Sequence, residues 1–496
     1  MSNLKIKLTV FSSGFSIMLL EVLASRIIAP YHGSSTLVWS TIIGVILAAM
    51  SLGYIIGGRL ADKNPSEKKL SEILLYCALL IFLLTLAKEI ILPLTTILGI
   101  RAGSLAASVI LLSAPSIYLG MVLPYAIKLA SGNPSKVGGL VGSLYSLSAL
   151  ASIAGTLVAG YILLPTQNIS RVLFGISLIL LLLSLMWDRR GKKTEKYFIM
   201  AIVLAFMVFY NYSYYTPLKT LHLEYTPYDM ILVDEGAYER YLHLDGTYEG
   251  GIRLTQNNLT VFDYINYFEL AYIARPETKD VLVVGEGTGV GPRQIQINHP
   301  DSQITIAEIN PRVHETAKKY FLLQENDNLK VKLGDIRSTI KTDTGKYDYV
   351  ILDAFNGIYT IPYYLLTKEF FSELKERMNP GGVLLLNIIT PVQGPKSNLF
   401  KSVVRTMNEE FSHIQIYPLE DDRSALQNVI VIASEKPLPE KQEMLDRTVD
   451  TPVMNKTKLA SMINREAEDQ LKPETEGIIY TDDFSPADSI YTSILT

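Results

Sequence analysis

Long apolar stretches follow one another through the first 215 residues of the chain, and they constrain its fold more than any other feature. They lie at about 9–29, 36–58, 73–98, 103–127, 138–164, 170–187 and 197–215. A helix satisfies all of its own backbone polar groups, and about 20 apolar residues are enough to cross a bilayer. The sequence therefore predicts an N-terminal multi-pass α-helical membrane domain of about seven helices at residues 1–215.

The segments between these stretches alternate in charge. Those after the second, fourth and sixth stretches, together with the N-terminus, carry 13 Lys and Arg, whereas the opposite segments carry three. Because short basic loops stay in the cytoplasm, the pattern predicts a cell-membrane protein with a cytoplasmic N-terminus. Seven crossings would place the rest of the chain outside, and a segment 197–215 lying at the interface would keep it inside. The sequence leaves both arrangements open.

The remaining residues have a different composition. Residues 221–496 contain 27 Lys and Arg against 42 Asp and Glu, whereas residues 1–220 contain 18 against 7. An acidic half argues against nucleic-acid binding, which depends on basic surface. It suits a cationic small substrate, and it equally keeps a domain soluble. The single cysteine, Cys77, excludes an internal disulfide.

Two further regions are expected after the membrane domain. Residues 216–279 are predicted to form a linker and a small β-hairpin region, with Asp245-Gly246 at a turn. Residues 280–496 alternate between strand-like and helix-like segments, which predicts an α/β Rossmann-like, methyltransferase-type domain whose ligands bind at the carboxyl ends of the strands. Its strands are expected at 281–284, 304–308, 330–333, 349–353, 383–389, 413–417 and 429–433.

Ligand-binding residue types stand at the ends of the first four of these strands. The first strand runs into a glycine-rich loop with Gly285, Gly287 and Gly289. Glycine allows the tight turn and the close backbone approach that a nucleotide needs. At the end of the second strand, the carboxylate of Glu308 can accept both ribose hydroxyls.

The next two strand ends carry aspartates. Asp335 can meet an adenine amino group, and Asp353 would lie beside the reactive carbon of an adenosyl ligand. Either aspartate alone is also a common turn former. Together with the glycine loop and Glu308 they predict an adenosyl-binding site. NAD is the rival ligand, but the chain shows no second nucleotide-binding half.

With these motifs the chain resembles the spermidine synthase (polyamine aminopropyltransferase) family, specifically its membrane-bound branch. The resemblance runs from about residue 228 to at least residue 389. The matching segments are Tyr228, Leu244-Asp245-Gly246, the loop Gly285–Gly291, Glu308, Gly334-Asp335, Leu352-Asp353-Ala354 and the closing Thr481-Asp482-Asp483-Phe484-Ser485-Pro486.

The resemblance implies an activity and a set of roles. A membrane-bound aminopropyltransferase would move an aminopropyl group from decarboxylated S-adenosylmethionine, its co-substrate, to an amine, in polyamine and spermidine biosynthesis. Asp353 is then the catalytic aspartate, Glu308 binds ribose and Asp335 binds adenine. The residues assigned to the substrate are Tyr228, Asp229, Tyr264 and Asn356.

Three positions depart from the family pattern. Thr288 replaces an Asp of the glycine loop, Asn356 replaces a second Asp after the catalytic one, and Tyr228-Asp229 replaces Tyr-Gln. Two carboxylates that hold cationic amines are thus missing, and Asp229, Asp482 and Asp483 are the candidates to substitute for them.

Alternative functions remain open at this point. The same fold serves S-adenosylmethionine-dependent methyltransferases, here acting on a membrane-associated substrate, and a non-enzymatic polyamine transporter or sensor is the third reading. The expected partners are a small amine or a membrane-associated acceptor and the lipid bilayer, with no nucleic acid. No metal is expected, because no metal-ligand spacing is present. A homo-oligomer stays open.

Overall fold

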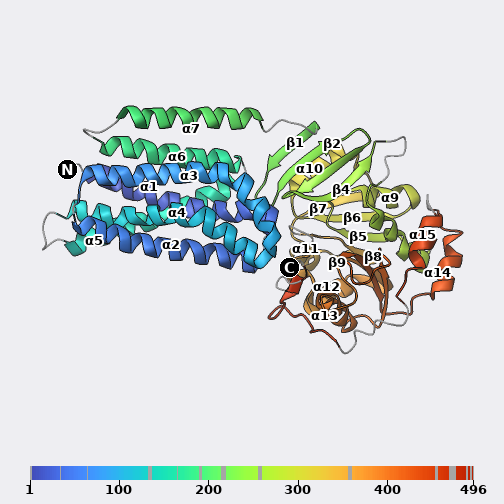
Figure 1. Cartoon of the computed structure of the whole chain (residues 1–496). Helices are drawn as coiled ribbons and strands as arrows, with labels where there is room; N and C mark the ends of the chain where they lie inside the picture. Colours follow the sequence, from blue (N-terminus) through green and yellow to red (C-terminus); the bar gives the residue numbers. More distant parts are fainter. Residues whose placement is uncertain are drawn as a thin grey trace. The chain divides into compact units, whose positions relative to one another are not determined.

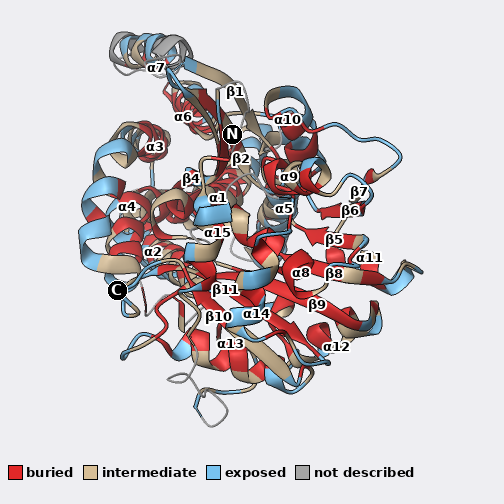
Figure 2. Ribbon diagram, turned by 90° about the vertical axis from the view of Figure 1, so that its right-hand side faces the viewer, coloured by how far each residue is buried: buried red, intermediate tan, exposed pale blue. Residues whose placement is uncertain are grey.

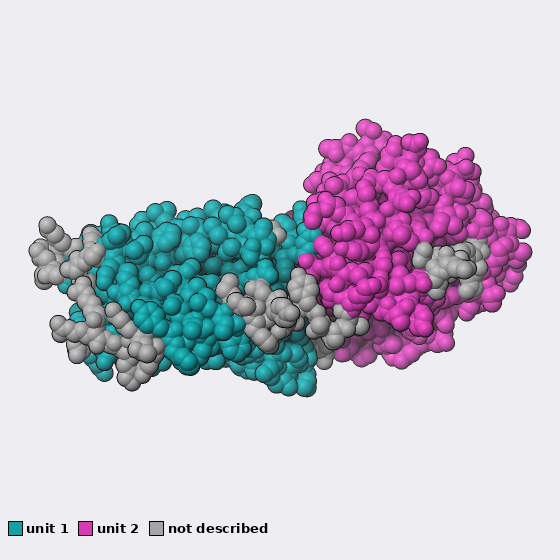
Figure 3. Space-filling view, turned by 90° about the horizontal axis from the view of Figure 1, so that it is seen from above, with its two compact units in different colours: residues 1–217, 224–229, 496 teal, residues 218–223, 230–495 magenta. Residues whose placement is uncertain are grey.

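The computed structural model describes residues 3–33, 35–63, 65–131, 137–164, 166–188, 193–213, 219–254, 260–355, 360–452, 456–467, 476–487, 490, 491 and 494. The chain divides into two compact units, which Figure 3 shows in different colours. Unit 1 comprises residues 1–217, 224–229 and 496. Unit 2 comprises residues 218–223 and 230–495.

Unit 1 consists of long helices that run alongside one another (Figure 1). Its described helices are α1 Asn3–His32, α2 Thr36–Lys63, α3 Glu67–Thr95, α4 Gly99–Ala130, α5 Val137–Val158, α6 Ile169–Trp187 and α7 Lys193–Ser213. Among the described residues, five helical stretches are long and apolar enough to cross a membrane. One of these, Glu67–Ala130, contains both α3 and α4, which are separated by a short 3-10 turn and by Gly99 with a φ of 71°.

Close backbone approach holds α2 against α4. A Cβ added at Gly53 would overlap the main-chain oxygen of Ile117, and one added at Gly57 would lie 2.6 Å from the main-chain oxygen of Met121. Small residues at such crossings are typical of helices that associate in lipid, where close van der Waals packing replaces the hydrophobic effect. The sequence therefore determines this helix pair through its glycines.

Buried polar groups in unit 1 are mostly hydroxyls. Thr9, Thr85 and Ser177 donate to helix carbonyl oxygens at 2.8–2.9 Å. A buried ion pair joins Lys196 of α7 to Asp188 at the end of α6, with Nζ and Oδ2 2.8 Å apart and side chains 8% and 7% exposed. Lys196 also donates to Ser71 of α3 at 2.5 Å. This network fixes the beginning of α7 against α3 and α6.

Two antiparallel hairpins begin unit 2. Its smaller sheet has the order β1-β2-β3-β4, with β1 Lys219–Tyr225, β2 Met230–Glu235, β3 Glu239–Leu244 and β4 Thr247–Arg253. The predicted turn is confirmed, because Asp245 and Gly246 connect β3 to β4 with φ values of 47° and 85°. The prediction of a linker over the first of these residues was wrong in part, since β1 pairs with β2 and makes the sheet larger than one hairpin.

The larger sheet of unit 2 follows the predicted strand–helix alternation. Its order is β10-β11-β9-β8-β5-β6-β7. The strands are β5 Asp280–Val284, β6 Gln303–Glu308, β7 Leu329–Leu333, β8 Tyr347–Leu352, β9 Met378–Thr390, β10 His413–Pro418 and β11 Gln427–Ser434. Neighbours among β5 to β9 are parallel, whereas β11 is antiparallel to both β9 and β10. This is a Rossmann-like α/β sheet, as predicted.

Helices cover both faces of this sheet, and its central strands are buried (Figure 2). Alternate strand residues face opposite ways, so Leu282 and Val284 enter one core and Val281 and Val283 enter the other. The first core contains α11 Ile336–Thr342, α12 Lys368–Glu376 and α13 Asn398–Asn408. The second core contains η4 Asp263–Glu269, α8 Leu270–Ala274, α9 Val290–Asn298, α10 Pro311–Tyr320, α14 Lys441–Thr448 and α15 Lys456–Ile463.

Candidate functional site

The switch point of the larger sheet brings the predicted motifs together. The chain order reverses between β5 and β8, and ligands of open α/β sheets bind beyond the carboxyl ends of the strands at such a point. The glycine loop follows β5, Glu308 ends β6, Asp335 follows β7 and Asp353 follows β8. The four motifs therefore stand on four adjacent strands of one sheet edge.

The glycine loop needs its glycines for conformation and for space. Gly285, Gly287 and Gly289 have φ values of 90°, 53° and 69°, a region that residues with a Cβ rarely adopt. A Cβ at Gly285 would also overlap the main-chain oxygen of Asp353. The loop then enters α9, whose first residues follow directly. Within the loop the N–H groups of Gly285 and Gly289 donate to the carbonyl oxygens of Ala307 and Glu286, which fixes its backbone.

Glu308 is buried at the end of β6, with 7% of its surface exposed. Its Oε2 accepts the backbone N–H of Glu286 at 3.0 Å, and its Oε1 accepts that of Asn310 at 2.7 Å. These two bonds fix both carboxylate oxygens between the glycine loop and the start of α10. The carboxylate thus has a fixed position at the sheet edge.

Asp335 caps the helix α11. Its Oδ1 accepts the backbone N–H of Ser338 at 3.2 Å, and its Oδ2 accepts the hydroxyl of Tyr364 at 3.1 Å. Burial and the Asp335 carboxylate raise the pKa of Tyr364 to about 12, so the phenol stays protonated and donates. Capping α11 does not exclude a ligand contact, because one lone pair on each Asp335 oxygen remains for a further donor.

Asp353 is held by two side-chain donors. Asn387 of β9 donates to its Oδ1 at 2.8 Å, and Tyr264 of η4 donates to its Oδ2 at 3.1 Å. Asn387 is fully buried and accepts from Asn428 of β11 at 3.0 Å, which fixes the orientation of its amide. Burial raises the pKa of Asp353 to about 6, although both hydrogen bonds act to lower it. The result is a fixed carboxylate with increased proton affinity.

Two carboxylates near the site were not predicted. Glu286, within the glycine loop, is buried against Nδ1 of His314 at 2.9 Å, and burial raises the pKa of Glu286 to about 7. Glu249 of β4 lies close enough to Tyr264 to contribute, after burial and Asp353, to the raised pKa of that phenol. The only sequence signal near Glu249 is the Asp245-Gly246 turn, which places Glu249 on the strand that follows.

The other residues singled out in the sequence are engaged in packing and in a turn, or lie outside the described part of the chain. Thr288 is buried, and a Cβ at Gly250 of β4 would lie 2.7 Å from its Cγ2, so the smaller sheet packs on this part of the loop. Tyr228 and Asp229 belong to unit 1 rather than unit 2. Both donate their backbone N–H to Thr226 in a tight turn. Asn356 lies outside the described residues.

Asp482, a candidate amine-binding carboxylate, is already engaged. Its two oxygens accept both terminal nitrogens of Arg337, at 2.8 and 2.7 Å. Oδ1 also accepts the hydroxyl of Thr367 at 2.8 Å. This pairing lowers the pKa of Asp482, so its charge neutralises a guanidinium rather than a substrate amine.

Together the fold and this sheet edge define a Rossmann-like α/β domain with a candidate ligand site. Residues 267–442 match the spermine/spermidine synthase domain. The chain therefore carries the domain of the spermine and spermidine synthases and is a homologue of the polyamine aminopropyltransferases.

Relatives match different lengths of the chain. A polyamine aminopropyltransferase of Vibrio vulnificus is 29% identical over 238 residues, which are 47% of this chain and 76% of the relative. Polyamine aminopropyltransferase 2 of Aquifex aeolicus is 23% identical over 443 residues, or 84% of each chain. That second match is longer than unit 2 and so extends into the helical half.

Solved structures of spermidine synthases show lower identity to this chain. The crystal structure of a probable spermidine synthase from Corynebacterium glutamicum is 21% identical and covers 48% of this chain and 89% of that chain, with a TM-score of 0.41. A spermidine synthase in complex with the transition state analogue AdoDATO is 18% identical and covers 49% of this chain and 85% of that chain, with a TM-score of 0.39.

Proposed function

We propose that the protein is a membrane-bound aminopropyltransferase that uses decarboxylated S-adenosylmethionine and a cationic amine acceptor. The observation that carries this proposal is Asp353. It is a fixed carboxylate with a raised pKa, at the end of β8 and directly beside the glycine loop. An enzyme that alkylates amines needs such a base, because an alkylammonium has a pKa of about 10 and cannot attack while protonated.

In this proposal Glu308 and Asp335 hold the adenosyl donor. Two backbone bonds fix the buried Glu308 carboxylate at the end of β6, where a ribose diol would lie. Asp335 caps α11 and is oriented by Tyr364, and it would meet the adenine amino group. The glycine loop supports the fit, because its three positive φ values form a tight turn whose Glu286 N–H is bonded to the Glu308 carboxylate. The donor supplies a carbon activated by an adjacent sulfonium.

Asp353 and Tyr264 then act on the acceptor. Asp353 accepts one proton of the acceptor ammonium, and the freed lone pair forms the new C–N bond as the C–S bond breaks, leaving a neutral thioether. Tyr264 and Asn387 keep the carboxylate in place during this transfer. Glu249 adds a second negative charge near Tyr264, and we propose that it holds the far end of a cationic acceptor.

A second candidate is S-adenosylmethionine-dependent methyl transfer. One observation favours it, namely that the buried Thr288 leaves the glycine loop without a carboxylate at the position that grips the aminopropyl amine in the resembling family. Mass spectrometry of products distinguishes the two. The full-length protein in detergent is supplied with each donor, candidate diamines and total lipid. We expect an aminopropylated amine with the decarboxylated donor only, whereas a methylated product with S-adenosylmethionine would overturn the proposal.

We also propose a division of labour along the chain. Residues 1–215 form the membrane domain, 216–279 the linker and small sheet, and 280–496 the catalytic domain. The length of the Aquifex aeolicus match supports the membrane-bound branch.

The packing of α7 supports a seventh crossing. Lys196 and Phe206 of α7 contact Ser71 and Phe82 of α3, so the two helices run in the same direction side by side. Arg26 lies near the C-terminal end of α1 and donates to the carbonyl oxygens of residues 227 and 228 at 2.6 and 2.7 Å. With the basic segments inside, we propose that the catalytic domain lies on the side opposite the N-terminus.

Cysteine labelling tests this topology, because Cys77 is buried and does not compete. An impermeant maleimide applied to intact cells should label Asp421→Cys, a position whose side chain is 90% exposed. It should leave Lys7→Cys, on the exposed surface of α1, unlabelled until the cells are opened. Labelling of both positions only after opening would place the catalytic domain in the cytoplasm.

A further inference from the structure

The segment 480–485 near the C-terminus is bonded to the elements that follow the loop after Asp353. Lys368 donates its backbone N–H to the carbonyl of Tyr480 at 2.9 Å, and Asp482 donates its own to Oε2 of Glu369 at 2.9 Å. Thr367, the N-cap of α12, donates to the Asp482 carboxylate. The segment is therefore fixed to the beginning of α12 at several points.

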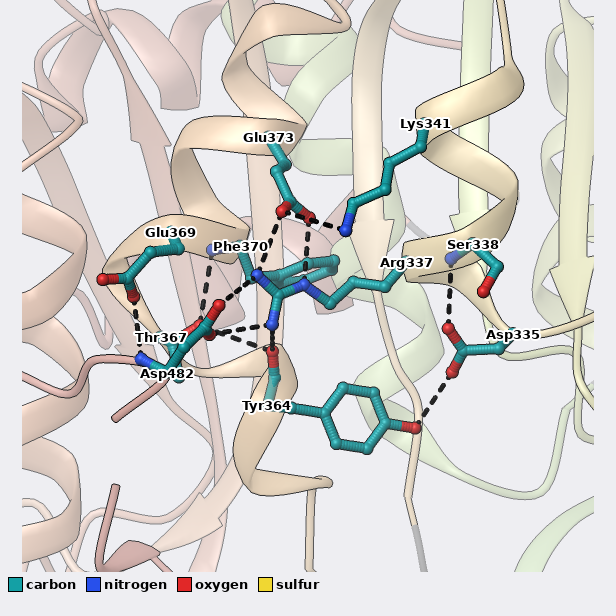
Figure 4. Close-up of polar contacts among 10 residues, drawn as sticks. All are labelled: Asp335, Arg337, Ser338, Lys341, Tyr364, Thr367, Glu369, Phe370, Glu373 and Asp482. Carbon is teal, nitrogen blue, oxygen red and sulfur yellow. Dashed lines mark hydrogen bonds and ion pairs between the residues drawn. The ribbon is translucent and has the colours of Figure 1, made fainter. Parts of the chain in front are cut away.

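Arg337 of α11 is the centre of this arrangement, as Figure 4 shows. Besides its two bonds to Asp482, it makes two bonds to Glu373 of α12, at 2.9 and 3.0 Å. Its guanidinium also lies over the Phe370 ring, and its side chain is 16% exposed. Bidentate pairs of this kind hold a fixed geometry, unlike single exposed ion pairs. Arg337 thus ties α11 both to α12 and to the C-terminal segment.

Tyr364 connects this network to the proposed adenine site. It lies in the short 3-10 helix η5 Tyr363–Leu365, directly before α12. Its carbonyl oxygen accepts from Arg337 at 3.5 Å and lies 3.4 Å from the hydroxyl oxygen of Thr367, whose proton goes to Asp482. Its hydroxyl donates to Asp335. Figure 4 shows the phenol ring extending from the Arg337 cluster to Asp335. A shift of η5 would therefore move the group that orients the Asp335 carboxylate.

We propose that Asp482 is a positioning residue for the adenosyl donor: through Arg337 and Thr367 it fixes Tyr364, and Tyr364 aims the Asp335 carboxylate at the adenine amino group. This inference rests on the proposed function, because it gives Asp335 its adenine-binding role. Asp482 does not touch the donor. It acts on donor affinity and leaves the geometry of Asp353 unchanged.

The test compares Asp482→Asn with Asp483→Asn in the full-length protein. Asp483 is the adjacent exposed carboxylate, with no hydrogen bond or ion pair among the described residues, which makes it a matched control. Calorimetry with methylthioadenosine should show a five- to tenfold weaker binding for Asp482→Asn, about the effect of one weakened hydrogen bond. Asp483→Asn should bind methylthioadenosine like the parent, because this ligand lacks the amine for which Asp483 is a candidate partner. The KM for the donor should rise by the same factor while kcat stays unchanged.

A double variant separates positioning from general stabilisation. Tyr364→Phe removes the hydroxyl that Asp482 is proposed to aim, so Asp482→Asn should cause no further loss of affinity in that background. If Asp482→Asn does not fold, Arg337→Lys takes its place, since it keeps the charge but not the bidentate pair. Equal losses in both backgrounds, or a lower thermal midpoint with unchanged affinity, would overturn the inference. A parent protein that binds no methylthioadenosine would overturn the proposed function itself.

Discussion

The two units differ in the charged groups that they bury. In unit 1 the buried polar side chains are mainly hydroxyls bonded to helix carbonyl oxygens, and the buried ion pair Lys196–Asp188 joins the ends of two helices. In unit 2 carboxylates are buried, including Glu286 and Glu308, and each is met by donors from another part of the chain. A hydroxyl can be satisfied by its own helix, whereas a buried carboxylate must be satisfied by tertiary structure.

The Lys196–Asp188 pair and Asp353 illustrate this difference. Lys196 and Asp188 neutralise one another, and Ser71 takes part in the same network, so the pair offers nothing to a ligand. Asp353 is held by two neutral donors, and its charge remains available. Removing a charge should therefore cost stability in unit 1 and activity in unit 2.

The largest effect is expected at Asp353. Asp353→Asn keeps the shape of the side chain but cannot take the acceptor proton, so turnover should fall by about 10²–10⁴-fold. Affinity for methylthioadenosine should change little, because Glu308 and Asp335 remain. Kinetics and calorimetry on one preparation measure both quantities. Near-normal turnover would sink the catalytic role, since Asn is itself a good turn residue.

Lys196→Met should produce the opposite result. It leaves Asp188 buried without its cation, and breaking a buried pair typically costs about 3–5 kcal/mol of unfolding free energy. Turnover per folded molecule should stay the same. Lys128→Met is the control, because its pair with Asp62 is exposed and should contribute less than about 1 kcal/mol. Equal losses from the two variants, measured by unfolding in mixed micelles, would contradict the comparison.

Glu308→Gln should weaken the donor site without unfolding it. The amide keeps one acceptor oxygen but presents an NH₂ group to a ribose hydroxyl. The affinity for methylthioadenosine should therefore fall by about 1.5–3 kcal/mol, the range for hydrogen bonds to charged groups. Unchanged affinity in calorimetric titration would remove Glu308 from the site.

The pH dependence should give the smallest effect. The pKa of Asp353 is raised to about 6 and its ionised form is the active one, so turnover should fall about tenfold per pH unit below 6. The stability effect has the opposite sign. Because the native state holds this proton more tightly than the unfolded chain, stability should decrease as pH rises from about 4 to 6. Asp353→Asn should lose both dependences, and a rate unchanged between pH 5 and 7 would contradict the assignment.

The sequence predicted much of this arrangement because local pattern determines it. Apolar runs predicted the strands, and the parallel sheet then brought Gly285, Glu308, Asp335 and Asp353 to one edge. What could not be predicted is the side-chain partners. Tyr264 is predicted to bind the substrate, and no sequence pattern indicates that it also donates to Asp353.

Other partners show the same limit. Arg337 and Asp482 are far apart in the chain, and no periodicity relates them. Such contacts depend on the tertiary packing of loops, for which one sequence carries no local signal. The strand β1 was missed although Leu221-His222-Leu223-Glu224-Tyr225 alternates between apolar and polar residues, which is the period of a strand.

The contact between Gly285 and the main-chain oxygen of Asp353 limits how this protein can vary. There is no room for even one methyl group between the two strand ends, so the glycine loop and Asp353 must change position together. A chimera that takes β5 from one relative and β8 from another should work only where both parents space these strand ends alike. Natural and engineered variants should therefore change the glycine loop after β5 and Asp353 after β8 together.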